Sequence, residues 1–318
     1  MRSATSRLFL FTIFCSASGA MAGDAVIAAD LADTAVPGTP SLPEHLALAL
    51  LVAWSLVAAV IAVRKGWLQG SGSVRWRLGL YEDQILIACG VLLSGLVASV
   101  VASLLRATAG TTPAPGISLA AILASSGVTL GAWWLLRNNA LGVQNRPVDA
   151  PATCSNTRAI GAGLMGLLLA WPVVALTTRL GEWIQIRAGG PAVPEVAHQT
   201  LEQLREHAHE PLAWLLALAV TLLTPLTEEV LWRGAVQQAF KSAGLPRTLA
   251  MIGASALFAL VHWNAVPAEA RAGALPALFL LGLLFGWLFE RSGSLLAPFA
   301  AHAAFNAANL ILFSTLPG

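Results

Sequence analysis

The sequence predicts an all-α fold: a polytopic transmembrane helical bundle of about eight spans that follows an N-terminal signal-like segment. Hydrophobic residues make up 57% of the 318 residues and charged residues only 11%, whereas soluble domains carry about 25% charged residues. Apolar stretches near the roughly 20 residues that cross a bilayer recur along the chain. These observations exclude an ordinary soluble domain. We expect the lipid bilayer as a partner and no nucleic acid.

The N-terminal segment has the three parts of a secretory signal. Arg2 and Arg7 form a basic region, residues 8–15 are apolar, and an A-x-A sequence of the kind that signal peptidases cleave follows. We therefore interpret residues 1–22 as a signal peptide, with an uncleaved anchor helix as the alternative. Residues 23–44 are polar and rich in aspartate and proline, which predicts a polar extracytoplasmic segment.

The remaining chain divides into two membrane regions. Four regular apolar stretches predict an N-terminal four-helix membrane region over residues 45–178. A polar stretch over residues 179–210 predicts an extracytoplasmic loop, and four less regular stretches occupy residues 211–314. In order, the eight predicted spans are 45–63, 85–105, 117–136, 159–178, 211–242, 248–263, 273–289 and 294–314.

Basic residues are divided unevenly between the two sides of the predicted bundle. Ten lie on one side and five on the other, and the side with more lysine and arginine is the cytoplasmic one. Both ends of the mature chain are then outside. The ten are Arg64, Lys65, Arg75, Arg77, Arg137, Arg146, Arg158, Lys241, Arg247 and Arg291, and the five are Arg106, Arg179, Arg187, Arg205 and Arg271.

The predicted span over residues 211–242 is unusual in length and in charge. One straight helix of this length would reach about 48 Å, against roughly 30 Å of hydrocarbon. Pro225 is expected to kink or break it, and Glu228, Glu229 and Arg233 follow. Ionisable side chains at membrane depth face a protein interior or a wet cavity and commonly mark function.

The two adjacent glutamates are expected to have different partners. Glu229 and Arg233 are four residues apart, with the acid first, which is the favourable order for an ion pair on a helix. Glu228 points about 100° away from Glu229, so it is free to face another group. By themselves these charges fit a juxtamembrane cluster without chemistry as well as they fit a catalytic site.

Two histidines inside predicted spans favour a catalytic site. His262 ends one span, and His302 shares a helix face with Asn306 in the last span. A carboxylate and a histidine together can activate water, and a second histidine with an amide can donate hydrogen bonds to an oxyanion. The set Glu228, His262, His302 and Asn306 therefore has the groups that hydrolysis needs.

Three sequence motifs over residues 210–314 resemble those of the CPBP family, the CAAX-processing and bacteriocin-processing intramembrane proteases, also called the Abi family. They are Glu228-Glu229-x-x-x-Arg233, Phe258-x-x-x-His262 and His302-x-x-x-Asn306. The resemblance implies a membrane-embedded endopeptidase with a helical bundle around a conical cavity. It also implies that Glu228 and His262 activate water, that His302 and Asn306 stabilise the oxyanion, and that Glu229, Arg233 and Phe258 support them.

Other functions stay open at this point. Glu228, His262 and His302 could ligate zinc, since three protein ligands and a water form a catalytic zinc site. The chain has no H-E-x-x-H sequence and Asn306 is a poor zinc ligand, so we favour a mechanism without a cofactor. The further alternatives are a non-catalytic binder or scaffold in the membrane, and a proton-moving transporter, although the polar residues cluster in one third of the chain and form no repeat.

The resemblance implies peptide-bond hydrolysis in a membrane-associated peptide or protein. The signal-like segment and the composition predict a bacterial inner-membrane protein with several passes. Prenylated CAAX proteins are therefore not the expected substrates, and nothing in the sequence specifies a cleavage site.

Overall fold

The computed structural model describes residues 42–64, 80–109, 115–138, 155–191, 203–204 and 206–314. Within these ranges the regular structure is helical, without strands. The predicted signal peptide, residues 1–22, lies outside the described residues, as does all of the predicted polar segment 23–44 except its last three residues, which begin the first helix.

The described helices form eight runs that coincide with the eight apolar stretches. They confirm the all-α membrane bundle, and the second and the fifth run contain π-helical turns. In order they are α2 (Leu42–Arg64); α3 (Leu80–Ile87), η2 (Ala88–Leu93) and α4 (Ser94–Ala109); α5 (Pro115–Asn138); α6 (Asn156–Arg187); α8 (Pro211–Leu218), η3 (Ala219–Leu223), α9 (Thr224–Leu231), η4 (Trp232–Val236) and α10 (Gln237–Ser242); α11 (Arg247–Val261); η5 (Ala268–Ala270) and α12 (Arg271–Ser292); and α13 (Leu296–Ser314).

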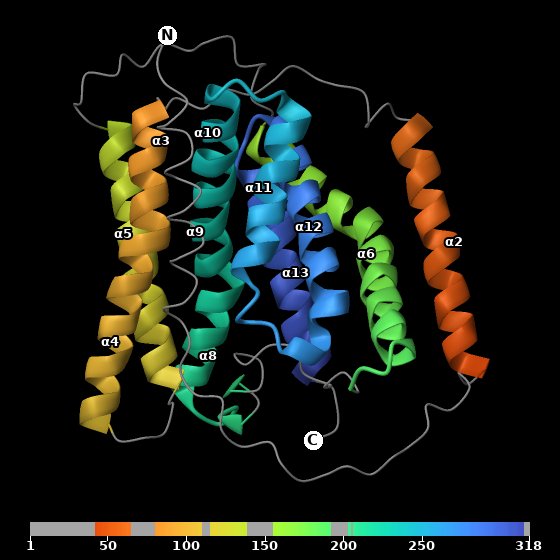
Figure 1. Ribbon diagram of the computed structural model, residues 1–318, viewed down its shortest axis with the longest axis horizontal. Helices are drawn as coiled ribbons and strands as arrows, with labels where there is room; N and C mark the ends of the chain where they lie inside the picture. Colours follow the sequence, from red (N-terminus) through yellow and green to blue (C-terminus); the bar gives the residue numbers. More distant parts are fainter. Residues whose placement is uncertain are drawn as a thin grey trace.

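The π-helical turns lie in two of these runs: η2 joins α3 to α4, and η3 and η4 flank α9. Neighbouring runs point in opposite directions, so that the chain goes up and down through the bundle (Figure 1). The ends at Arg64, Ser242 and Arg247 therefore lie on one side of the bundle. This is the side that the basic residues predict to be cytoplasmic. α6 continues to Arg187, beyond the predicted end of its span at residue 178.

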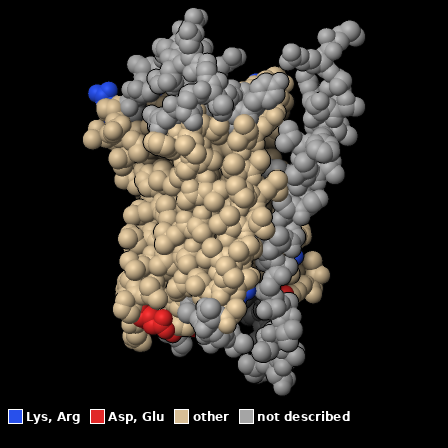
Figure 2. Space-filling model, turned by 90° about the vertical axis from the view of Figure 1, so that its left-hand side faces the viewer, with Lys and Arg blue, Asp and Glu red and all other residues tan. Residues whose placement is uncertain are grey.

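The outer surface is suited to lipid. Among the described residues, five helices are long and apolar enough to cross a membrane, namely residues 83–107, 115–136, 156–187, 211–242 and 268–292. Two shorter apolar helices in the same part of the chain cover 247–261 and 296–312. On the face in Figure 2 a broad band carries no charged side chain, and the charged side chains in view lie above and below it. The chain is therefore a multi-pass membrane protein.

The run α8–α10 lies inside the bundle. α3 and α5 pack on one side of it, and α11, α12 and α13 lie on its other side (Figure 1). A buried apolar cluster that includes Leu281, Phe285 and Ala297 joins α6, α12 and α13. The position of α8–α10 shields its polar residues from lipid.

Small residues allow α6 to approach its neighbours closely. A Cβ atom at Gly181 would overlap the carbonyl group of Ala272, and one at Gly163 would overlap the carbonyl of Ala297. A Cβ at Gly273 would lie 2.6 Å from the carbonyl oxygen of Thr178. Glycine is therefore required where α6 crosses α12 and α13, and these contacts fix α13 in the bundle.

Candidate active site

Pro225 was predicted to kink or break the run that carries the two glutamates, and the run is not broken there. The helix is continuous from Pro211 to Ser242, with π turns before and after the glutamates. The N–H of Thr224 donates to the carbonyl of Ala219 and that of Gln237 to Trp232, each five residues back. The turn η3 directly precedes Pro225, so the missing N–H of the proline is accommodated within the helix.

Glu229 and Arg233 form a fully buried ion pair, as their spacing predicts. The Nε atom of Arg233 donates to Oε2 of Glu229 over 2.9 Å, and both side chains are 0% exposed. Buried charges are stable only when they are paired and hydrogen-bonded. This pair therefore fixes the Glu229 carboxylate and removes it from contact with water.

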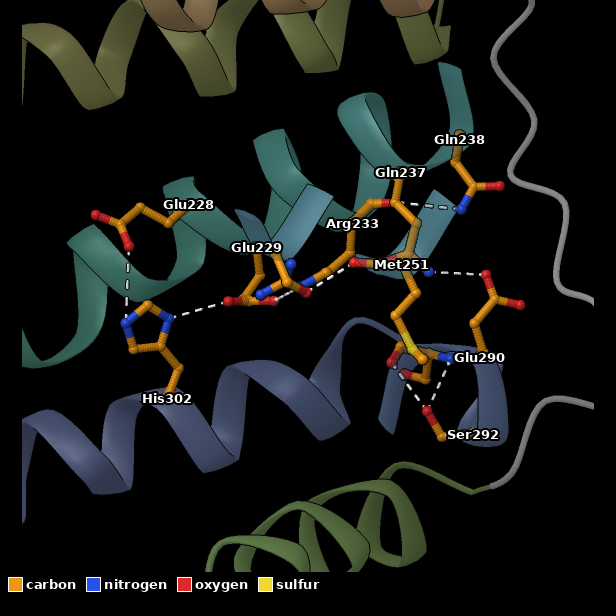
Figure 3. Close-up of polar contacts among 11 residues, drawn as sticks. Glu228, Glu229, Arg233, Gln237, Gln238, Met251, Glu290, Ser292 and His302 are labelled. Carbon is orange, nitrogen blue, oxygen red and sulfur yellow. Dashed lines mark hydrogen bonds and ion pairs between the residues drawn. The ribbon is translucent and has the colours of Figure 1, made fainter. Parts of the chain in front are cut away.

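His302 lies between the two glutamates. Its Nδ1 is 3.0 Å from Oε1 of Glu229, and its Nε2 is 3.7 Å from Oε2 of Glu228 (Figure 3). Because the Glu229 carboxylate is paired with Arg233, it accepts the hydrogen bond and Nδ1 donates it. The Glu228 side chain is 24% exposed. Glu228 is thus the acid that remains accessible, and it faces His302.

Aromatic rings hold the cations and the histidine in place. The ring of Phe285 stacks on His302, with centroids 4.7 Å apart and planes 20° apart. The guanidinium of Arg233 lies 5.5 Å from the centroid of Phe258 and 5.7 Å from that of Phe285. An arginine over aromatic faces is stabilised by their negative electrostatic potential. Phe258 and Phe285 therefore support the buried charges in an otherwise apolar core.

His262 lies at the end of α11, next to the same aromatic group. Its ring is 4.9 Å from that of Phe258, which is in turn 6.0 Å from His302. The Nδ1 atom of His262 is 2.7 Å from the carbonyl oxygen of Phe258. A carbonyl only accepts, so Nδ1 carries the proton and Nε2 is the free acceptor of the neutral ring. Within the described ranges no hydrogen bond joins His262 to Glu228.

Asn306 is on α13, one turn beyond His302. Its Nδ2 atom donates to the carbonyl oxygen of Val220 over 2.9 Å. The side chain is half-buried, and this bond connects α13 to the π turn before Pro225. An amide carries two N–H groups, so the second one is available for another acceptor.

The zinc alternative finds no ready group of ligands among the described residues. In the described part of the chain no three His, Cys, Asp or Glu side chains form a group that could hold a metal ion. Both nitrogens of His302 face carboxylates, and Nδ1 of His262 is bound to a backbone carbonyl. Zinc binding by Glu228, His262 and His302 would therefore require their side chains to rearrange.

A second buried polar group, which the sequence analysis missed, continues from the site toward one end of the bundle. Glu290 is 0% exposed and accepts from Nε2 of Gln237 over 2.8 Å (Figure 3). It also accepts from Nζ of Lys241 over 2.8 Å, and Nε of Arg247 lies 3.6 Å away. It joins α10, α11 and α12. The sequence does contain a signal for this group, because Glu229, Arg233, Gln237 and Lys241 follow one another at intervals of four residues and so lie on one face of a helix.

The comparisons with known proteins agree with this part of the chain. Residues 210–308 match the family model described as type II CAAX prenyl endopeptidase Rce1-like. Neither the curated proteins nor the solved structures gave a match. The matched residues include every member of the three motifs, and the Rce1-like family consists of proteases, which hydrolyse peptide bonds. Residues 210–308 of this membrane protein therefore match an Rce1-like type II CAAX prenyl endopeptidase domain, which is consistent with the CPBP family of intramembrane proteases.

Proposed function

We propose that the protein is an intramembrane endopeptidase in which Glu228 is the general base. The observation that carries this proposal is the difference between the two adjacent acids. Glu229 is 0% exposed and bound to Arg233, whereas the Glu228 side chain is 24% exposed and faces the ring of His302. A general base must reach a water molecule, and of the two only Glu228 has that access.

In the proposed reaction Glu228 and His262 activate the attacking water. Glu228 takes a proton from the water as its oxygen attacks the scissile carbonyl carbon, and the proton later goes to the leaving amine. His262 presents Nε2 as an acceptor because Nδ1 is held by the carbonyl of Phe258. This acceptor can orient the second hydrogen of the same water. Catalytic hydrogen bonds often form only when substrate binds, so a direct bond between Glu228 and His262 is not required.

His302 and Asn306 are proposed to stabilise the oxyanion. Since Nδ1 of His302 donates to Glu229, a hydrogen bond from Nε2 requires a proton on both nitrogens. Asn306 uses one N–H for Val220 and has the second for the oxyanion. Each donor to an oxyanion typically contributes about 10²–10³ in rate.

The proposed substrates are membrane-associated peptides or proteins, cleaved within reach of the buried site. We propose a bacterial inner membrane as the location, as the signal-like segment and the composition predict, and the substrate itself is best found by experiment. Membranes with wild-type protein and with Glu228→Gln are compared by proteomics for new peptide ends. A substrate yields ends that depend on Glu228. If no end differs although the protein is folded and present, the assignment of Glu228 is refuted.

The mechanism without metal is tested on purified protein. We expect Glu228→Gln to abolish cleavage, and Asn306→Ala and His302→Ala each to lower kcat by about 10²–10³ with little change in KM. Metal content is measured in parallel, on protein purified without chelator. Stoichiometric zinc that is lost together with all activity in His302→Ala would overturn the proposal in favour of a zinc protease. Activity in metal-free protein supports it.

A further inference from the structure

The carbonyl of Val220 has lost its donors within its own helix. In a regular α-helix it would accept from the N–H of Thr224, but that N–H donates to Ala219 instead, in the π turn η3. In the π register the donor would be residue 225, which is a proline without an N–H. A backbone acceptor without a partner in a buried setting costs free energy comparable to a lost hydrogen bond.

In the other two π turns of the described helices, a side chain donates a hydrogen bond to the carbonyl at the corresponding position. In η2 the carbonyl of Gly90 accepts from the hydroxyl of Ser94, and in η4 the carbonyl of Arg233 accepts from Nε2 of Gln238 over 3.2 Å. Each donor comes from the same helical run, four or five residues away. At η3 the donor is Asn306, 86 residues away on another helix.

From these contacts we infer that Asn306 is a positioning residue, which joins α13 to the run α8–α10 through the acceptor that Pro225 leaves open. The joint lies next to the catalytic groups on both helices. Asn306 is one turn from His302 on α13, and Pro225 is three residues before Glu228. The joint thereby sets how closely Nε2 of His302 approaches Glu228, now 3.7 Å. The catalytic consequence rests on the proposed function, whereas the joint itself rests on the contacts.

The test is a double-mutant cycle between Asn306→Ala and Pro225→Ala, measured by unfolding of the detergent-solubilised protein. In the wild-type background Asn306→Ala leaves the Val220 carbonyl without a donor and should raise the unfolding equilibrium constant roughly 5- to 150-fold. In the Pro225→Ala background residue 225 supplies an N–H to this carbonyl. The effect of Asn306→Ala should then be smaller, about 2- to 13-fold, because only the net contribution of one hydrogen bond is lost.

Asn309 is the matched control. It lies on the same helix, and its Nδ2 donates to the carbonyl of Phe305 on its own helix over 2.9 Å. Asn309→Ala should have the same effect in both backgrounds. An equal effect of Asn306→Ala in both backgrounds, or none in the wild type, overturns the joint.

The pH dependence of kcat/KM shows whether Asn306 positions His302 or acts only on the oxyanion or on stability. The ring of His302 faces Glu228 and Glu229, and Arg233 faces it through Glu229. If Asn306 sets these distances, Asn306→Ala should displace the pH–rate profile relative to wild type. Loss of an oxyanion donor alone lowers the rate equally at every pH, and loss of stability alone leaves the profile of the folded fraction unchanged. The stability measurements can show the full coupling between Asn306→Ala and Pro225→Ala while Asn306→Ala leaves the pH–rate profile in place. That result refutes the positioning of His302 but leaves the proposed function intact.

Discussion

Replacing Glu229 by glutamine should destabilise the protein far more than the same change at the preceding residue. Glu229 receives two donors, Nε of Arg233 over 2.9 Å and Nδ1 of His302 over 3.0 Å. A carboxylate accepts both. The amide of glutamine has one accepting oxygen and one donating NH₂ group, so one of the two contacts becomes a donor facing a donor.

The magnitude follows from the surroundings of Arg233. Its side chain is 0% exposed, and within the described residues neither Nη1 nor Nη2 has a hydrogen-bond partner. Apart from Glu229 the guanidinium contacts the faces of Phe258 and Phe285. Neutralising Glu229 leaves this cation buried without its anion, and breaking such a pair costs about 3–5 kcal/mol.

The assay is equilibrium unfolding in mixed detergent micelles, with tryptophan fluorescence as the signal. Glu228→Gln is the matched control, since the adjacent side chain is partly exposed and lies 3.7 Å from its nearest charged partner. We expect it to lose activity with a stability change below about 1 kcal/mol, as for an exposed pair. Equal losses of stability in the two variants would refute the different roles that we assign to Glu228 and Glu229.

The double variant Glu229→Gln/Arg233→Met separates the buried charge from other effects. Replacing both members of a buried ion pair by groups without charge is often neutral or stabilising. The double variant should therefore recover most of the stability that Glu229→Gln loses. If it is less stable than the single variant, the cost does not come from an uncompensated arginine.

Three further outcomes are expected. Gly181→Ala should destabilise the protein by about 1–3 kcal/mol through overpacking. Gly161→Ala on the same helix should not, because a Cβ there meets nothing within 4 Å. Equal unfolding midpoints for the two variants would contradict the close crossing of the helices. Glu290→Gln should destabilise by up to about 3–5 kcal/mol while the folded fraction keeps its kcat, which a loss of kcat without a loss of stability would disprove. In a cysteine-free background Ser155→Cys should be labelled only from the cytoplasm and Gln199→Cys, outside the described residues, only from the other side; the reverse pattern would invert the topology.

The helices could be predicted because each depends on residues that are close together in the sequence. Apolar stretches of near-spanning length gave their positions, and an i, i+4 spacing gave the pair of Glu229 and Arg233. The π turns were not predictable in this way, because they change the hydrogen-bond register without changing hydrophobicity. That is why a break was expected at Pro225 where the helix continues.

The spacing of residues in the sequence could not predict the contacts between helices. His302 and Glu229 are 73 residues apart, and only the packing of α13 against α9 brings them together. The resemblance named Glu228, Phe258 and His262, which lie close to His302 or to its aromatic neighbours, but the roles of these residues in catalysis stay proposals. Glu290 was missed because a single glutamate at the end of an apolar stretch reads as part of a loop, and its partners lie on α10 and α11.

Hydrolysis consumes one water molecule for each peptide bond, so a protease inside a bilayer needs a supply of water. α11 has 15 residues and is about 22 Å long, roughly 8 Å shorter than the hydrocarbon core. Beyond it, His262 is half-exposed and Trp263 and Asn264 are exposed. Non-helical backbone at membrane depth is stable only against protein or water. We infer that a helix that stops short of the far surface lets the aqueous phase approach His262, and we expect that lengthening α11 by one turn would lower the rate of cleavage.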